Sequence, residues 1–105
     1  MIEDEVLEIV NSGADGVDGL TRLVDQFRES RDVEELLRLL LSDNDDLVNI
    51  GTLITSEISA ERYNTVAFIR RLRELSHHAL PSVQTYAFRS LFPFDNPTKQ
   101  ESPIG

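Results

Sequence analysis

Apolar positions along this chain recur at helical spacing, and two stretches of them repeat at an interval of 36 residues. Both members of each matched pair are apolar or small: Val33 and Ile69, Leu36 and Leu72, Leu39 and Leu75, Leu47 and Val83, Ile50 and Tyr86, and Gly51 and Ala87. A helix pair that recurs at such a period is typical of a stacked α-solenoid, in which each unit buries its apolar face against its neighbour. Because such proteins usually bind other molecules, the repeat favours a binding protein over an enzyme.

The same spacing predicts six helices, over residues 2–11, 20–30, 33–41, 45–59, 61–76 and 81–91. Asp32 and Glu35 have the spacing of a capping box at the start of the third helix, and the acidic turn 43–46 is expected to cap the fourth. Pro81 suits the first position of the sixth helix, whereas Pro93 and Pro97 are expected to end it.

The segments between and beyond these helices complete an all-α prediction. Residues 12–19 hold three glycines and two aspartates and are expected to form a loop. The core face of helix 61–76 is expected to carry Val66, Ile69, Leu72 and Leu75. No segment alternates with period two, so no strand is predicted. A chain of 105 residues is expected to form one domain, here residues 1–94, followed by a flexible polar tail at 95–105.

Composition narrows the chemistry and the compartment. The chain has no cysteine, which excludes disulfides, thiol catalysis and thiolate metal sites. The acidic N-terminus does not resemble a signal peptide, and no apolar run approaches the length of a membrane span. The expected location is therefore the cytoplasm, away from membranes.

The net charge of −9 is unevenly distributed. Residues 1–61 hold 16 acidic and 4 basic side chains, a balance of −12, whereas residues 62–105 hold 3 acidic and 6 basic ones, a balance of +3. An acidic surface repels nucleic acid and attracts basic partners. The alternative is that the charge serves solubility alone.

Short pieces of the repeat carry a family resemblance. In Leu47-Val48-Asn49-Ile50-Gly51 and in Val83-Gln84-Thr85-Tyr86-Ala87, an apolar residue is followed four positions later by a small one. This resembles the second helix of a HEAT repeat, where the small residue lets two helices approach closely. The resemblance covers residues 32–92, with 2–30 as a degenerate capping unit. HEAT repeats often carry Arg after the first apolar residue, whereas this chain has Val48 and Gln84 there. The resemblance therefore does not extend to the ladder of charge pairs between repeats.

Residues 43–58 also look like small bacterial HEAT-like proteins, several of which resemble immunity proteins of toxin–immunity pairs, including contact-dependent inhibition systems. In that class a small acidic helical protein covers the active site or the substrate surface of a toxin. The resemblance implies this role for the chain; periodicity and spacing do not show it.

Two clusters suggest metal sites, and both fail on spacing. A calcium loop starting at Asp43 would place Leu47 and Ile54 at ligand positions. The turn 43–46 is therefore interpreted as a helix cap with solvated carboxylates, or as an acidic knob that meets a basic partner. His77 and His78 are adjacent, do not share a helix face, and have no third histidine or cysteine to join them. No metal or cofactor is expected.

Glu57 falls inside the apolar arc of its helix on a helical wheel. A buried carboxylate must be paired or protonated. The simpler interpretation is a structural ion pair, with Arg89 as the expected partner; the alternative is a recognition or catalytic acid.

The remaining motifs point away from enzymes and nucleic-acid binding. Arg70, Arg71 and Arg73 form the only basic run, but around a helix they point in different directions. The chain has no Gly-x-Ser-x-Gly, no Gly-rich phosphate loop and no His-Glu-x-x-His.

The sequence therefore predicts a short HEAT-like α-solenoid of about three antiparallel helix pairs that binds one protein partner. The expected contact surface combines outward positions of the second helices with nearby acidic residues: Asp43, Asp45, Asp46, Asn49, Thr52, Ser56, Glu57, Glu61, Thr85 and Phe88. Phe88, exposed among polar groups, is the expected anchor.

Three hypotheses follow for the function. The first is an immunity protein that neutralises a basic toxin domain, with a nuclease as the expected type. The second is a cytoplasmic adaptor or scaffold with no inhibitory role. The third is a small enzyme or metal protein resting on Glu57 and the two histidines. The outer face of the stack is an alternative to the inner face as the contact surface.

Overall fold

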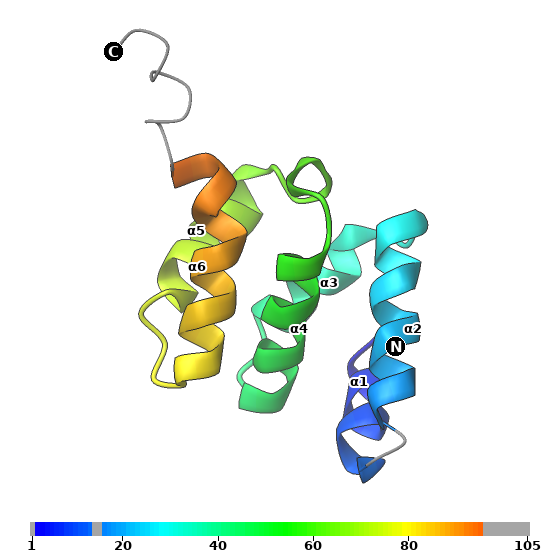
Figure 1. The fold of residues 1–105 in the computed structure, drawn as a ribbon. Helices are drawn as coiled ribbons and strands as arrows, with labels where there is room; N and C mark the ends of the chain where they lie inside the picture. The colour runs from blue at the N-terminus through cyan, green and yellow to red at the C-terminus, as the bar shows by residue number, and fades with distance from the viewer. Residues whose placement is uncertain (1, 14–15, 96–105) are drawn as a thin grey trace, which may run out of the picture.

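The computed structural model describes residues 2–13 and 16–95, over which the chain forms six α-helices, a short 3₁₀ helix and no strand. These elements are α1 (Ile2–Asn11), α2 (Gly16–Glu29), α3 (Val33–Leu40), α4 (Asp45–Glu57), the 3₁₀ helix η2 (Ala60–Arg62), α5 (Val66–Leu75) and α6 (Pro81–Asp95) (Figure 1). The all-α prediction is confirmed for these residues. None of these helices has the length and apolar content that a membrane crossing requires.

Local side-chain caps set where α3 and α4 begin. An oxygen of Asp32 accepts a hydrogen bond from the Glu34 amide at 2.9 Å, and Asn44 does the same for Asp46 at 2.8 Å. Such caps satisfy backbone donors that have no partner inside the helix. Helices α3 and α4 accordingly begin at the predicted residues. The Glu35 carboxylate, which was expected to complete a capping box, instead accepts from Arg31 with both oxygens.

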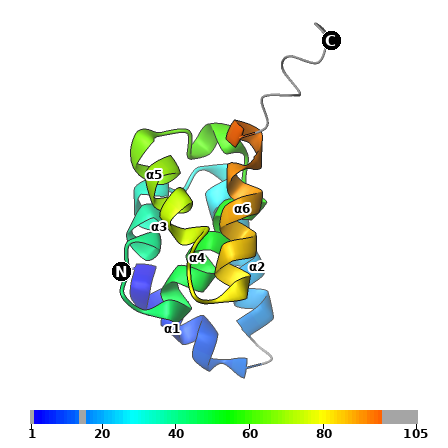
Figure 2. The ribbon, with the colours of Figure 1, turned by 90° about the vertical axis from the view of Figure 1, so that its left-hand side faces the viewer.

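Helix α4 is the centre of the molecule. It packs against α3 and α6 and also contacts α1 and α2, and Figure 2 places it between α3 and α5 on one side and α2 and α6 on the other. A Cβ atom at Gly51 would lie 2.9 Å from the Cβ of Leu39. The close approach of α3 and α4 therefore depends on a residue without a side chain, as the HEAT-like pattern led us to expect.

The two repeat stretches bury the same positions. Four of the six matched pairs are buried at both members, and the other two are half-buried at both. The buried pairs are Leu36 and Leu72, Leu39 and Leu75, Leu47 and Val83, and Gly51 and Ala87; the half-buried pairs are Val33 and Ile69, and Ile50 and Tyr86. The 36-residue repeat in the sequence is thus also a repeat of environment.

The fifth helix begins five residues later than predicted, at Val66 rather than at residue 61. Two side chains explain the difference. The buried Tyr63 donates a hydrogen bond to the Ser90 carbonyl at 2.8 Å, which holds residues 60–64 outside the helix. Thr65 then caps α5 by accepting from the Phe68 amide at 3.3 Å. Val66, expected in the core, is consequently 72% exposed, and Phe68 occupies the core in its place.

Two further boundaries differ from the prediction. Helix α2 begins at Gly16, inside the segment predicted as a loop, because Gly16 packs directly on the carbonyl group of Ile9. Pro93 lies inside α6 rather than ending it. Only two residues of the helix follow Pro93, and one of them, Phe94, packs edge-on against Tyr63 at a ring-centroid distance of 5.8 Å. Residues 96–105 of the predicted tail lie outside the described residues, as do residues 14 and 15 of the predicted loop.

Candidate functional site

The acidic turn between α3 and α4 presents three exposed carboxylates, from Asp43, Asp45 and Asp46. The turn is ordered by its own side chains, since Ser42 accepts from the Asn44 amide at 3.0 Å and Asn44 in turn caps α4. Asp45 and Asp46 occupy the first turn of α4, where the helix dipole favours negative charge. The caps therefore hold the carboxylates at one end of the central helix.

This turn lies beside the start of α6. Asp45 approaches the imidazole of His78, with an oxygen-to-Nε2 distance of 3.5 Å. Asn49, one turn into α4, accepts a hydrogen bond from the hydroxyl of Ser82 at 2.7 Å. Thr85 lies exposed one turn further along α6. We name Asp43, Asp45, Asp46, Asn49 and Thr85 the turn surface; the structure brings these five predicted contact residues to one end of the molecule.

Three other predicted contact residues lie at the opposite end of α4. Ser56 and Glu57 close the helix and Glu61 lies in η2. Twelve residues separate Asp45 from Glu57, so the two ends are roughly 18 Å apart along the helix axis. Ser56 is half-buried and donates to the Leu53 carbonyl at 2.7 Å, whereas Glu61 is exposed. The predicted contact residues of α4 and its flanks therefore fall into two groups, one at each end of the helix.

Glu57 forms an ion pair, as the simpler interpretation expected, but its predicted burial and its predicted partner were both wrong. Its side chain is 38% exposed and pairs with Arg28 of α2 at 3.1 Å rather than with Arg89. Arg28 also donates to the Glu57 backbone carbonyl at 3.0 Å and lies 3.6 Å from Asp25. The wheel placed Glu57 inside the apolar arc of α4, but its side chain lies toward α2 and reaches solvent there. The contact joins the ends of α2 and α4.

Thr52 was expected to point outward and is instead fully buried. Its hydroxyl lies 3.0 Å from the Val48 carbonyl and 2.9 Å from that of Asn49, so the buried polar atom is satisfied within its own helix. The side of α4 that carries Thr52 is covered because α4 is packed on several sides. Thr52 cannot contact a partner in this structure. Phe88, by contrast, is exposed as predicted, at 64%.

A hollow between α2 and α4 is lined by Leu20, Thr21, Val24, Asp25, Arg28, Leu53 and Glu57. It encloses about 230 Å³, below the roughly 300–1,000 Å³ typical of small-molecule pockets. Its charged groups, Asp25, Arg28 and Glu57, already pair with one another. We therefore interpret this hollow as a gap between two packed helices and not as a small-molecule site.

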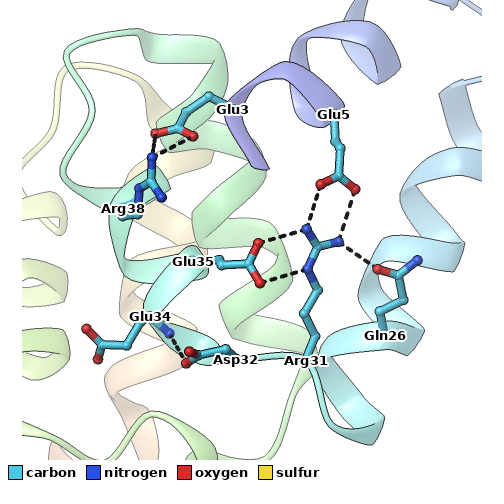
Figure 3. A network of polar contacts seen from close by, with 8 residues as sticks. All are labelled: Glu3, Glu5, Gln26, Arg31, Asp32, Glu34, Glu35 and Arg38. Carbon is cyan, nitrogen blue, oxygen red and sulfur yellow. Dashed lines mark hydrogen bonds and ion pairs between the residues drawn. The ribbon is translucent and has the colours of Figure 1, made fainter. Parts of the chain in front are cut away.

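An extensive polar network centres on Arg31, which the sequence analysis did not identify as a site (Figure 3). Its five guanidinium N–H groups make five hydrogen bonds, two to Glu5, two to Glu35 and one to Gln26, at 2.6–3.2 Å. With all donors used, the guanidinium has no capacity left for a ligand. The network joins α1, α2 and the start of α3, so its role is structural. The only sequence signal was the Arg31–Glu35 spacing of four.

A second arginine extends the Arg31 network. Arg62 of η2 donates to the backbone carbonyls of Phe27 and Arg31, the latter at 2.8 Å. The Arg31 guanidinium also lies 5.3 Å from the centre of the Phe27 ring. Hydrogen bonding to Arg31 lowers the pKa of Glu5 from its ordinary value, and the same carboxylates raise the pKa of Arg31. Both groups therefore stay charged at neutral pH.

The histidine pair and the arginine run also have local partners. His78 accepts from the Leu80 amide at 3.0 Å through Nδ1, while His77 is exposed. Arg71 donates to the Leu40 carbonyl at 2.7 Å and pairs with Glu74 at 2.9 Å. Among the described residues, no group of three or more histidine, cysteine, aspartate or glutamate side chains is placed to hold a metal ion.

Comparison with protein-family models, curated proteins and solved structures finds no match to this chain. The HEAT-like and immunity-protein resemblances therefore stay predictions from the sequence.

Proposed function

We propose that this chain is a HEAT-like stack of three helix pairs, α1–α2, α3–α4 and α5–α6. The equal burial of the six matched positions supports the repeat. So does the close approach at Gly51, whose matched residue Ala87 is also small and buried. In such a stack the middle pair is covered on both sides, which agrees with the many packing partners of α4.

We further propose that the protein binds and neutralises a basic partner, as an immunity protein does with a toxin domain. The observation that carries the proposal is the acidic turn, where three of four consecutive residues present exposed carboxylates. Elsewhere several carboxylates, among them Glu3, Glu5 and Glu35, are neutralised by arginines of the fold. Among the residues that the structure describes, the one basic side chain paired with the turn is the imidazole of His78, beside Asp45.

The negative field of residues 1–61 would accelerate encounter with such a partner, and the turn surface would then cover its active site or substrate-binding surface. A nuclease is the expected partner type, because an enzyme that acts on nucleic acid carries a basic substrate surface. The rigid caps of the turn favour binding, because little conformational freedom is lost when a preorganised surface docks.

An adaptor or scaffold role is the second candidate, and a specific observation favours it. Exposed apolar side chains are also present on other elements, with Val66 on α5 at 72% exposure and Phe88 and Phe92 on α6 at 64% and 49%. A protein that links others needs more than one contact surface. An immunity protein needs one.

The first experiment is affinity capture of the tagged protein from its host's lysate, with washes at low and high salt and mass spectrometry of the retained proteins. One stoichiometric basic partner would support the immunity proposal. Several unrelated or acidic partners would favour the adaptor. Co-expression then separates the two roles, because an immunity protein restores growth to cells that express the captured partner and an adaptor does not.

Association kinetics with the captured partner would test the turn surface itself. The variant Asp43→Lys with Asp46→Lys reverses two exposed charges that form no ion pair within residues 2–13 and 16–95, whereas Asp45 contacts His78. The matched control, Glu29→Lys with Glu34→Lys, makes the same change in net charge away from the turn surface. We expect association of the turn variant to slow by at least about tenfold at low salt, and far less in the control. Equal rates for the two variants would refute a role for this turn.

A further inference from the structure

Helix α6 is apolar on two sides, which lie roughly 120° apart around its axis. Its inner side, formed by Val83, Ala87 and Leu91, is buried. On its outer side Phe88 and Phe92 lie one turn apart and are 64% and 49% exposed. A helix that is apolar on both sides is normally covered on both sides, and exposed aromatic side chains that cluster are typical of interfaces.

The repeat explains why this side of α6 is open. Phe88 and Phe92 lie 36 residues after Thr52 and Ser56. In α4 those two positions are buried and half-buried, and the pair α5–α6 packs against that helix. Phe88 and Phe92 thus occupy the positions at which the preceding unit is covered by the next. The outer side of α6 is the uncovered end of the described stack.

The charges around this surface are compatible with a second copy of the chain. Among the described side chains of α6, from Pro81 to Phe94, only Arg89 is charged, and it lies about 100° around the helix from Phe88. The hollow beside Phe88 is lined by Ser76, His77, Gln84 and Thr85, without a carboxylate. The acidic excess of −12 belongs to residues 1–61. Two copies can therefore meet through α6 without opposing their acidic surfaces, which would repel one another in most other orientations.

We propose that this chain forms a two-fold dimer through the outer side of α6. In an antiparallel crossing of two α6 helices, Phe88 of one copy packs on Phe92 of the partner subunit, and Phe92 on Phe88 of the partner subunit. Two like side chains one turn apart are self-complementary about such an axis, so the contact closes at two copies and does not propagate. The occupant of this surface is a second copy of the chain.

Sedimentation velocity over a wide range of concentration tests the dimer. The variant Phe88→Ser with Phe92→Ser removes the aromatic pair, and each substitution acts twice because the axis repeats the contact. We expect dimerisation to weaken by at least about thirtyfold, the loss typical of a truncated central anchor. The matched control, Leu41→Ser with Val66→Ser, removes two side chains that are 58% and 72% exposed on α3 and α5. It should leave the dimer within a few-fold of the unmodified protein.

Amide chemical shifts of the unmodified protein provide a second test that needs no variant. The concentration-dependent shifts should be confined to α6 and the adjoining turn 76–80. A protein that stays monomeric at every concentration would overturn the proposal, and so would a dimer that the serine pair leaves intact. Equal weakening by the control would also overturn it, because the association would then be non-specific. Protection of Phe88 and Phe92 in a monomer would assign the surface to another segment of the same chain.

Discussion

Replacing Gly16 or Gly19 with alanine tests how closely α1 and α2 pack, because both glycines face the same residue. A Cβ atom at Gly16 would lie 2.4 Å from the carbonyl oxygen of Ile9. A Cβ atom at Gly19 would lie 3.1 Å from Cγ1 of the Ile9 side chain and 3.6 Å from its Cδ1. One substitution therefore meets rigid backbone, and the other meets side-chain atoms that need to shift by only a few tenths of an ångström.

The expected energies have opposite signs. Carbon and oxygen ordinarily stay about 3.3 Å apart or more, so the new atom at residue 16 would be about 0.9 Å too close. Overpacking of this kind costs roughly 1–3 kcal/mol, and the gain from replacing glycine offsets about 0.4–1 kcal/mol of it. We expect Gly16→Ala to lose about 1–2 kcal/mol. Gly19→Ala should be neutral or gain up to about 1 kcal/mol, because alanine is favoured over glycine inside a helix.

Urea denaturation followed by helical circular dichroism would measure both variants, with the slope of the transition confirming that the unfolded states are comparable. In thermal unfolding, the loss at residue 16 corresponds to a fall in Tm of roughly 4–16 °C for a domain of this size. Equal stabilities for the two variants would refute the reasoning. So would a Gly16→Ala protein as stable as the unmodified chain, because α1 and α2 would then not be in contact at this carbonyl.

Three further predictions test other parts of the fold. Hydrogen bonding to Arg31 lowers the pKa of Glu5 below 4.5, so its contribution to stability is present above that pH and lost as pH falls; Glu5→Gln should flatten the acid limb of a plot of Tm against pH. Burial raises the pKa of Tyr63 above 10.0, so its neutral form stabilises the fold until pH rises past that value; Tyr63→Phe should lessen the alkaline loss of Tm. Substitutions at the fully buried Thr52 and the exposed Phe88 should differ in their cost to the free energy of unfolding. Thr52→Phe should lower it by roughly 1–3 kcal/mol through overpacking, and Phe88→Thr by less than about 0.5 kcal/mol. Urea denaturation of dilute protein would measure both.

The parts of the fold that the sequence predicted best are those set by neighbouring residues. Helices α3 and α4 begin where predicted because Asp32 and Asn44 lie directly before them and cap them. The core positions of the repeat followed from helical periodicity, which depends only on spacing within a helix. The acidic turn was predicted for the same reason, since a run of polar residues between two apolar helices has no alternative to the surface.

The parts that failed depend on residues far apart in the chain. Glu57 pairs with Arg28, which lies 29 positions earlier, and no pattern within α4 identifies that partner. The start of α5 depends on Tyr63 reaching the carbonyl of Ser90, 27 positions later. The Arg31 network joins three helices. Each of these contacts follows from how the helices pack, so it could be identified only from the structure.

Thr52 and Phe88 show what a repeat pattern can determine. They occupy the same register, yet one is fully buried and the other is 64% exposed. The register fixes which side of a helix faces along the stack, but exposure depends on whether another unit follows. The two surfaces proposed here consequently have different origins. The acidic turn is a local property of one connection, so substitutions elsewhere should leave it intact. The aromatic side of α6 exists because the described stack ends there, so any added unit or second copy that continues the stack must cover it.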